Sequence, residues 1–187
     1  MGVRKVIKGL VQPETTVIDI GCGTGVLVFY LSNNAVKVVG LDKNAEVLKF
    51  SKNKKRRLGI NNIEFIEKDI NDWDTLSEKS FDFVILSMVL HQFSLKEANH
   101  VLESAKKIAS YIVMADFNSP LSNNIIGFGS RMIEKIAGGQ HYMNFKDYQK
   151  RNGLDYFLDY HQLLILENQT AGLGAVRVVK VLVQDSQ

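Results

Sequence analysis

Three glycines alternate with other residues directly after a short apolar run that contains an acid. The run is residues 16–20, its acid is Asp19, and Gly21, Gly23 and Gly25 follow. Glycine permits a tight turn and lets a bound group touch the backbone, while the start of a following helix presents amide donors. The pattern predicts a strand-to-helix turn that holds a polar ligand. A turn without a ligand is the alternative, but three glycines exceed what a turn requires.

An acid also closes the second apolar run of the chain. Asp42 ends residues 35–42, a run rich in valine. Open α/β sheets bind ligands outside the carboxyl ends of their strands, where Asp19 and Asp42 would both lie. A carboxylate offers two acceptor oxygens to a vicinal diol, such as that of a ribose. Dehydrogenases use the same device, so Asp42 alone does not identify the ligand.

The elements that position these groups are apolar runs that alternate with amphipathic stretches. Strands are expected at residues 16–20, 35–42, 63–69, 81–90 and 111–117. Helices are expected at residues 3–11, 26–31 and 45–57, and after a capping box formed by Ser94 and Glu97. Strands that alternate with helices predict a parallel sheet covered on both faces.

Two further strands are expected near the C-terminus, at residues 161–167 and 175–183. The glycine-containing loop 168–174 suits an antiparallel hairpin. Asp82 and His161, each at the start of an expected strand, are assigned structural roles. Repeats, low-complexity tracts and linkers are absent from the sequence. Residues 1–187 are therefore expected to form a single domain, a three-layer α/β sandwich with a seven-stranded, mostly parallel sheet and a C-terminal antiparallel hairpin.

Composition excludes several classes of protein. Of the 187 residues 45% are hydrophobic, which is enough to bury a core. The single cysteine, Cys22, excludes an internal disulfide framework, and the four histidines show no metal-ligand spacing. No run of about 18 apolar residues is long enough to span a membrane. The N-terminus lacks the apolar core of a signal peptide, so a cytoplasmic protein is expected.

The charge of the chain does not by itself point to a nucleic-acid partner. A net charge of +3 is too small to indicate one. The basic run of residues 52–57 could contact nucleic acid, but it lies near the end of an expected helix, where cations suit the dipole and a solvated face. Nucleic acid is therefore not expected to bind, and the oligomeric state is left open.

The spacing of the glycines separates two nucleotide-binding patterns. The dinucleotide fingerprint G-x-G-x-x-G would need a glycine where the chain has Val26. The observed D-x-G-x-G-x-G resembles the first motif of the class I S-adenosylmethionine-dependent methyltransferases. GLDKN, EFIEKDI and FDFVILSMVLHQF resemble the second, third and fourth motifs of that family, in order. The four motifs span residues 17–116, and the resemblance implies a Rossmann-like fold.

The resemblance also implies a cofactor, S-adenosyl-L-methionine, and its product, S-adenosyl-L-homocysteine. In the family, the acid at Asp42 accepts both ribose hydroxyls, the acid at Asp69 takes the adenine amino group, and the amide at Ile70 faces an adenine nitrogen. The acid at Asp19 faces the ammonium group of the methionine moiety, although accepting amides from the turn is an alternative role. The cofactor-binding residues implied in this way are Asp19, Gly21, Cys22, Gly23, Gly25, Asp42, Lys43, Asp69, Ile70, Ser87 and Met88.

The acceptor site is expected around two histidines. His91 follows the fourth apolar run, at the rim where the transferred methyl group should lie, and packing as a buried polar residue is its alternative role. Residues 118–160 form an insertion that is expected to cover the substrate. Within it, His141, Tyr142 and Phe145 are candidate substrate contacts, with simple covering of the sheet as the alternative. His91 and His141 are the candidate catalytic bases.

These features predict methyl transfer to a small-molecule acceptor by in-line displacement. Alignment and exclusion of water supply most of the catalysis, and a hydroxyl or protonated amine also needs a base. A carbon or sulfur acceptor remains open. The fourth motif lacks the N-P-P-Y pattern of many adenine-amino and glutamine methyltransferases. The alternatives are an RNA or protein methyltransferase, a non-catalytic cofactor-binding partner subunit and, least favoured, a nicotinamide-dependent oxidoreductase.

Overall fold

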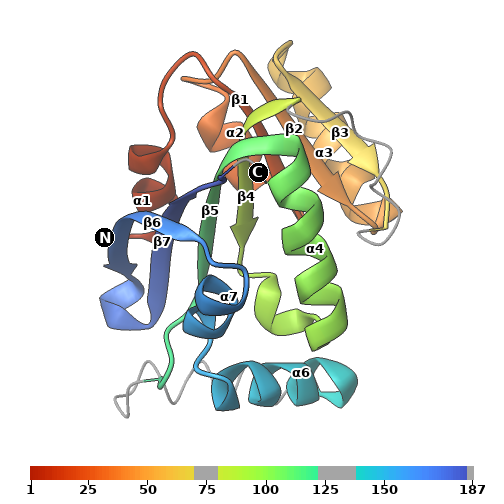
Figure 1. Ribbon diagram of the computed structural model, residues 1–187. Helices are drawn as coiled ribbons and strands as arrows, with labels where there is room; N and C mark the ends of the chain where they lie inside the picture. The colour runs from red at the N-terminus through yellow and green to blue at the C-terminus, as the bar shows by residue number, and fades with distance from the viewer. Residues whose placement is uncertain (70–79, 122–137, 185–187) are drawn as a thin grey trace.

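One mixed sheet of seven strands organises the protein (Figure 1). The computed structural model describes residues 1–69, 80–121 and 138–184. The strand order is β3-β2-β1-β4-β5-β7-β6; β7 is antiparallel to both of its neighbours, and the other pairs are parallel. The strands are β1 (Thr16–Ile20), β2 (Lys37–Asp42), β3 (Ile63–Glu67), β4 (Phe81–Ser87), β5 (Ala109–Phe117), β6 (Leu164–Ala171) and β7 (Val176–Leu182).

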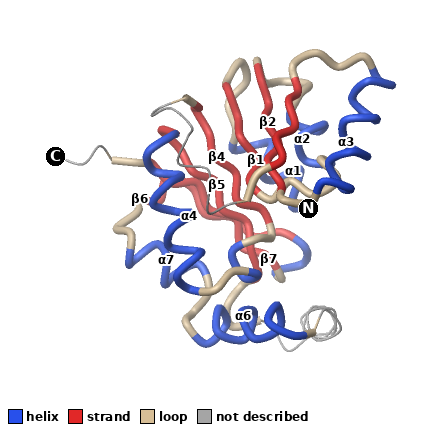
Figure 2. Tube along the Cα trace, turned by 90° about the vertical axis from the view of Figure 1, so that its right-hand side faces the viewer, coloured by secondary structure: helices blue, strands red, loops and turns tan. Residues whose placement is uncertain are grey.

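Helices cover both faces of this sheet. Helices α1, α2 and α3 pack on one face, and α4 and α7 pack on the other (Figure 2). Helix α6 lies at the edge formed by the carboxyl ends of β4 and β5, against the 3-10 helix η2 (Figure 1). The predicted Rossmann-like three-layer sandwich is confirmed. The helices are α1 (Val3–Leu10), α2 (Val26–Leu31), α3 (Ala45–Leu58), η2 (Leu90–Gln92), α4 (Leu95–Ile108), α6 (Gly139–Lys150), α7 (Leu154–Tyr160) and η3 (Gly172–Gly174).

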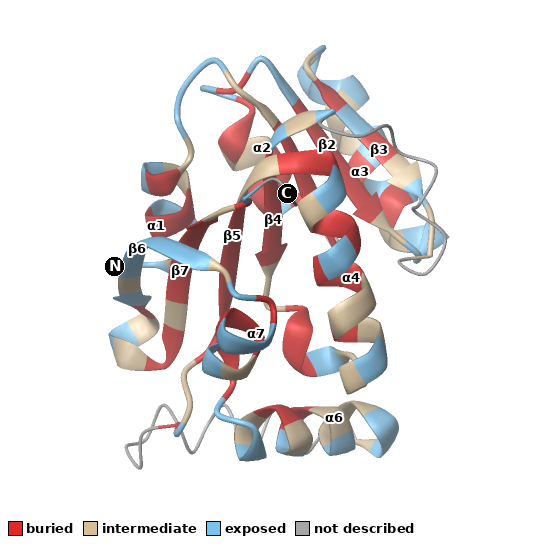
Figure 3. Ribbon diagram, in the orientation of Figure 1, coloured by how far each residue is buried: buried red, intermediate tan, exposed pale blue. Residues whose placement is uncertain are grey.

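The central strands are apolar throughout because both of their faces are buried. Val17, Ile18 and Ile20 of β1 have no exposed surface. Figure 3 shows this pattern: the middle of the sheet is buried, whereas the outer sides of the helices are exposed. β1 lies between β2 and β4, with Asp19 opposite Gly40 and Ile85. The register therefore brings the carboxyl ends of β1, β2, β4 and β5 to one edge of the sheet.

The ends of two helices have the caps that the sequence indicates. Asn44 accepts hydrogen bonds from the amides of the first turn of α3, and Gly59 ends that helix in the left-handed conformation, with φ 62°. Ser94 and Glu97 form the expected capping box at the start of α4.

Two boundaries differ from the sequence-based expectation. β4 ends at Ser87 rather than continuing to position 90, because Met88 has a positive φ of 58° and turns the chain into η2. β6 begins at Leu164, so the expectation that His161 opens this strand is wrong. His161 instead ends α7, where its ring contacts Glu103 at 2.8 Å and Asn99 at 3.0 Å. The assignment of His161 to a structural role agrees with these contacts.

The expected insertion at residues 118–160 contains two helices that the sequence reading did not assign. Phe145 and Tyr148 of α6 and Leu154, Phe157 and Leu158 of α7 are buried in the cluster on the α4 face. α7 therefore covers the sheet, whereas α6 lies at its edge. The helical pattern that the sequence suggests between positions 125 and 136 lies outside the described residues.

A reciprocal hydrogen-bond pair ties the starts of β1 and β4 together. The Asp82 carboxylate accepts from the backbone amide of Thr16 at 2.7 Å and from its hydroxyl at 2.8 Å. The Thr16 hydroxyl oxygen accepts from the Asp82 amide at 3.0 Å. These contacts give Asp82 the structural role that was expected, which is to join β1 to β4. They lie at the end of the sheet opposite the glycine turn.

Replacing Asp82 with alanine should weaken folding. The substitution removes two hydrogen bonds to Thr16, and a typical bond contributes about 1 kcal/mol. We expect Asp82→Ala to lower the free energy of unfolding in urea by about 1–2 kcal/mol. Asp82→Asn is the matched control, because its side-chain amide oxygen can still accept from Thr16 and the substitution should cost less. Equal unfolding free energies for Asp82→Ala and the parent would contradict a role in folding.

Candidate active site

The glycine turn between β1 and α2 is built by hydrogen bonds to β2. The amides of Gly21 and Cys22 donate to the carbonyl of Leu41 at 2.8 and 3.0 Å. The amide of Gly23 donates to the Asp42 carboxylate at 2.8 Å. β2 therefore holds the turn in place, and Asp42 is part of that support.

The glycines of the turn have different reasons to be glycine. A side chain at Gly25 would meet the Phe65 ring at 2.7 Å, so packing against β3 requires glycine there. A side chain at Gly23 would meet no atom within 4 Å, although its φ of 54° favours glycine. The turn is therefore closed toward the protein at Gly25 and open at Gly23. A ligand can approach the backbone on the open side.

Asp42 faces a small cavity beside the turn. Besides the Gly23 amide, its carboxylate accepts from the amide of Asn44 at 2.9 Å. Each carboxylate oxygen has a second lone pair that can accept from a diol. The cavity has a volume of about 130 Å³. Its lining residues are Gly21, Leu41, Asp42, Lys43, Lys68, Val89, Gln92 and Phe93.

Asp19 is a buried acid at the end of β1, only 3% exposed. Burial, together with the nearby Asp42 charge, raises the pKa of Asp19 from its ordinary 3.8 to about 8. The described turn amides donate to Leu41, Asp42 and Cys22, and within the described ranges no donor reaches the Asp19 carboxyl group. The alternative role, accepting turn amides, is therefore not what holds Asp19. A cationic ligand group is the partner that would favour its charged form.

The remaining cofactor-binding candidates on the β2 and β3 side lie near this cavity. Lys43 lines the cavity. Asp69 lies two residues after the end of β3. The residue before it, Lys68, donates its amide to the Asp42 carbonyl at 3.0 Å, so Asp69 lies next to the end of β2. Cys22 packs against Gly40, where an added side chain would meet its sulfur at 2.9 Å, and burial raises the pKa of its thiol. Ile70 lies outside the described residues.

Ser87 and Met88 lie where β4 ends beside the glycine turn. The next residue, Val89, would be 3.3 Å from a side chain built at Gly21, so the two loops are in contact. Met88 has a positive φ, which is uncommon for a residue with a side chain, and its amide donates to Ala115 at 2.7 Å. This strained corner directs the chain into η2, which carries His91.

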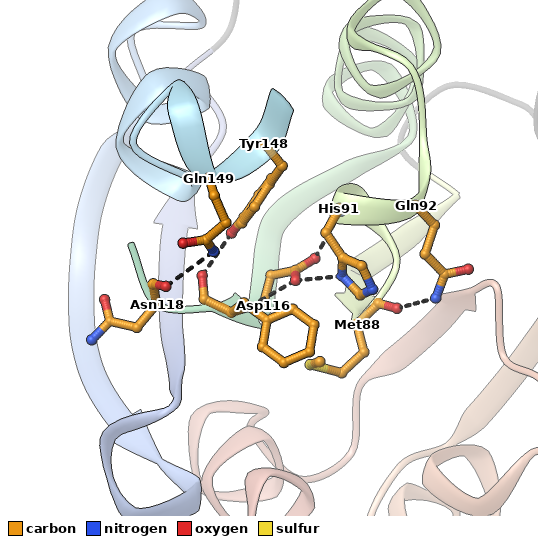
Figure 4. Close-up of polar contacts among 8 residues, drawn as sticks. Met88, His91, Gln92, Asp116, Asn118, Tyr148 and Gln149 are labelled. Atoms are coloured by element: carbon orange, nitrogen blue, oxygen red, sulfur yellow. Dashed lines mark hydrogen bonds and ion pairs between the residues drawn. The ribbon is translucent and has the colours of Figure 1, made fainter. Parts of the chain in front are cut away.

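His91 forms a buried pair with Asp116, which the sequence analysis did not select. The His91 Nδ1 atom lies 2.6 Å from one Asp116 oxygen, and its backbone amide donates to the other at 3.3 Å (Figure 4). The Phe117 amide also donates to Asp116, at 2.7 Å. His91 is 1% exposed and Asp116 is fully buried. Because Nδ1 faces a carboxylate, the second ring nitrogen, Nε2, is the one that can exchange a proton with a substrate.

Aromatic rings from α6 surround this pair. The His91 ring centroid lies 5.8 Å from that of His141, 6.1 Å from Phe145 and 6.3 Å from Tyr148, all near perpendicular. The Tyr148 hydroxyl donates to the Phe117 carbonyl at 3.0 Å, and burial raises the pKa of Tyr148 well above its ordinary value. Tyr142 packs against the same cluster. The structure therefore brings together His91, His141, Tyr142 and Phe145, the four acceptor-site candidates.

Asp116 could have been found from the sequence. It occupies the carboxyl end of β5, the same position that Asp19 and Asp42 occupy on their own strands. An acid at the end of an apolar strand was the signal used for those two residues. What the sequence could not show is the approach of η2, which pairs Asp116 with His91.

Neither a metal-ligand group nor a membrane-spanning helix is found among the described residues. In the part of the chain that the structure describes, no three His, Cys, Asp or Glu side chains group as they would around a metal ion. Across the same residues, no helix combines the length and apolar character needed to cross a bilayer. A larger cavity of about 670 Å³ lies between α1 and α2, away from the described acids.

Comparison with known proteins gives the family. Residues 12–157 match the model of the methyltransferase domain family. A stretch of 89 residues is 30% identical to "Probable (S)-tetrahydroprotoberberine N-methyltransferase 2" of Papaver bracteatum, covering 46% of this chain and 24% of that protein. The chain spans less than half the length of the curated relatives that it matches.

Solved structures share the fold along nearly the whole chain. An S-adenosylmethionine-dependent methyltransferase from Aquifex aeolicus has a TM-score of 0.71 at 21% identity, covering 96% of this chain and 88% of that one. Magnesium protoporphyrin IX methyltransferase from Synechocystis, with bound S-adenosylhomocysteine, has a TM-score of 0.67 at 18% identity, covering 96% and 79%. The chain therefore belongs to the methyltransferase domain family, among the class I S-adenosylmethionine-dependent methyltransferases.

Proposed function

We propose that this chain transfers a methyl group from S-adenosylmethionine to a small-molecule acceptor by in-line displacement. The observation that carries the proposal is the meeting of three groups at one edge of the sheet. These are the open glycine turn, the buried Asp19 that lacks a described donor, and the His91–Asp116 pair. The first two suit a cofactor with a cationic end, and the third suits removal of a proton.

The described residues fit this cofactor. Asp42 would accept the ribose hydroxyls beside the cavity, and Asp69 lies toward the adenine end. Asp19 would face the ammonium group, with Ser87 and Met88 bordering the methionine moiety. When bound, S-adenosylmethionine supplies a methyl group on a positively charged sulfur, which leaves as a neutral thioether.

His91 is the base that we assign to a hydroxyl or amine acceptor. Its Nε2 atom would take the proton that the acceptor loses as it attacks the methyl carbon. The imidazolium so formed faces the Asp116 carboxylate at 2.6 Å, which stabilises the positive charge in a site that excludes water. Asp116 also fixes the ring orientation, because its oxygens hold both Nδ1 and the backbone amide of His91. His141, with its ring 5.8 Å from that of His91, is the second candidate.

The covering by α6 supports a small acceptor. Phe145 and Tyr148 are 3% and 4% exposed, so buried rings of α6 cover the side of His91 that they contact. An enclosed apolar site strengthens electrostatic interactions within it and limits the size of the acceptor. An RNA or protein acceptor is the main alternative. A non-catalytic partner subunit is a weaker alternative, since it leaves the buried His91–Asp116 pair without a use, and the match to the methyltransferase domain family disfavours a nicotinamide-dependent oxidoreductase.

Binding of S-adenosylhomocysteine should depend on pH through Asp19. The pKa of about 8 means that Asp19 is neutral in the free protein at pH 6, so binding an ammonium group requires loss of a proton. We expect the affinity, measured by calorimetry, to rise from pH 6 toward pH 8, by at most about tenfold per unit. Asp19→Asn should weaken binding at pH 8 and remove this dependence. Asp42→Ala is the control, because it should weaken binding at every pH.

The same pKa makes a separate prediction about stability. The folded state keeps the Asp19 proton between about pH 4 and pH 8, whereas the unfolded state loses it. This group therefore makes the free protein less stable as the pH rises through that window. Asp19→Asn should be more stable than the parent at pH 8, by thermal denaturation without ligand. A parent protein whose binding and stability are both flat from pH 6 to pH 8 would overturn the assignment to Asp19.

Removing either member of the His91–Asp116 pair should impair the chemical step. Small hydroxyl and amine compounds would first be screened for S-adenosylhomocysteine production. We then expect His91→Asn and Asp116→Asn to lower kcat by about 100-fold or more, because general-base catalysis is typically worth that much. Affinity for S-adenosylhomocysteine should stay near that of the parent. Nitrogen-15 NMR should place the ring proton on Nδ1 in the parent, and a parent-like kcat in Asp116→Asn would contradict its role.

Helix α6 should respond to ligands if it covers the acceptor. Hydrogen exchange at residues 140–144 should be fast in the free protein and slow when S-adenosylhomocysteine and an acceptor are both bound. His141→Ala and Tyr142→Ala should reduce turnover without changing cofactor affinity, since the cofactor contacts come from other loops. Lys150→Ala, at the far end of α6, is the matched control. Equal protection from hydrogen exchange with and without ligands, together with parent-like turnover of His141→Ala and Tyr142→Ala, would show that α6 only covers the sheet edge and does not contact the acceptor.

A further inference from the structure

Lysine and arginine side chains from two helices gather around α2, on the sheet face opposite α4 and α7. Helix α1 contributes three of them, and the side of α3 that faces α2 contributes two. The ammonium of Lys54 lies 4.3 Å from the Phe29 ring centroid and that of Lys8 lies 4.8 Å from the Tyr30 ring centroid, so α2 joins the two groups. The residues that we call the basic face are Arg4, Lys5, Lys8, Lys54 and Arg57.

None of these five cations has an acidic partner among the residues that the structure describes. Residues 1–62 hold eleven lysines and arginines against four aspartates and glutamates, a net charge of +7, and the remaining residues carry −4. The small overall charge therefore hides a strong asymmetry. Such asymmetry favours a polyanionic partner.

Helix dipoles explain only part of the basic face. Arg57 lies in the last turn of α3, where cations are stabilising. Arg4 and Lys5, however, lie in the first turn of α1, which has no acidic residue, and cations there oppose the dipole. Their position does not stabilise the helix, so binding is the better explanation for the charges on α1.

A groove between α1 and α2 gives this face a shape. Its volume is about 670 Å³. Arg4 and Lys5 line one side, and Phe29 and Tyr30 line the other with Asn33. On α3, Phe50 is 58% exposed, and Lys54 and Arg57 follow it at helical spacing on the same side.

We propose that the basic face and its groove bind single-stranded RNA. Phosphates would contact the cations of the basic face, which have no acidic partner among the described residues, and a base would stack on the exposed Phe50 ring. The Asn33 amide can both donate to and accept from a ribose 2′-hydroxyl. A groove bordered by cations fits a strand better than it fits the flat surface of a bilayer, so RNA is favoured over an anionic membrane.

The inference goes beyond the proposed function and is independent of it. The acceptor site depends on His91 and α6, whereas the basic face depends on α1, α2 and α3. The two regions approach each other at the start of α2, where Val26 lines the groove and directly follows Gly25 of the turn. RNA binding would place the enzyme on a nucleic acid, whatever the size of its acceptor.

The test compares two triple variants of the full chain that remove the same charge. Lys5→Gln/Lys54→Gln/Arg57→Gln changes the basic face, and Lys96→Gln/Lys107→Gln/Lys150→Gln changes exposed cations elsewhere. Binding of a fluorescent 12-nucleotide single-stranded RNA is measured by anisotropy from 50 to 300 mM KCl. We expect the first variant to lose at least tenfold in affinity at 100 mM KCl and to reduce the slope of log K against log salt by about 2. The control variant should bind as the parent does.

Each outcome decides one claim. Parent-like binding by the first variant, equal losses in both variants, or no binding of RNA by the parent would overturn the RNA-binding face while leaving the proposed methyl transfer intact. Binding to vesicles that contain phosphatidylserine, without binding to RNA, would also overturn it in favour of a membrane. If RNA binds and becomes methylated, the result supports the RNA-binding face and overturns the proposal of a small-molecule acceptor. Unchanged melting temperatures in both variants are the control for folding.

Discussion

The carboxyl edge of the sheet must stabilise acidic groups where water is largely excluded, and the three acids there meet this requirement in different ways. Asp42 accepts two backbone amides, so its negative charge is compensated by the turn and by the start of α3. Asp116 faces the His91 ring and two further amides. Asp19 has no described donor, and burial instead favours its neutral form. Asp19 is therefore the acid whose charged form a cationic ligand would favour.

The role proposed for His91 also requires α6 to move. Phe117, Phe145 and Tyr148 surround the His91 ring, so they would keep an acceptor away from it as well as water. The hydrogen bonds of α6 are unevenly distributed. Tyr148 and Gln149, in its C-terminal half, bond the segment after β5, whereas Asn144 makes a single described bond to Gln92. The described bonds therefore anchor the C-terminal half of α6 to the end of β5 and the residues after it.

Local rules were enough to predict most of the fold from the sequence. Buried strands read as apolar runs, and capping residues such as Asn44 and Ser94 mark helix starts, so the layers and the hairpin follow. The errors arose where long-range contacts decide the structure. Met88 ends β4 because its φ is positive, and nothing in an apolar run indicates that. The helices α6 and α7 bury aromatic faces against distant strands, and their glycine-rich borders obscured the helical period. Asp116 was overlooked because its importance comes from η2, not from its own neighbours.

The distribution of charge shows a second kind of information that a linear reading loses. A single basic run on α3 is well explained by the helix dipole, and that explanation is sufficient until α1 is placed beside it. Once α1 and α3 flank α2, cations from both helices face the same solvent, and mutual repulsion makes their grouping costly without a partner. Only four acids accompany these cations within residues 1–62, and two of the four, Asp19 and Asp42, lie at the carboxyl edge of the sheet, where they belong to the candidate active site.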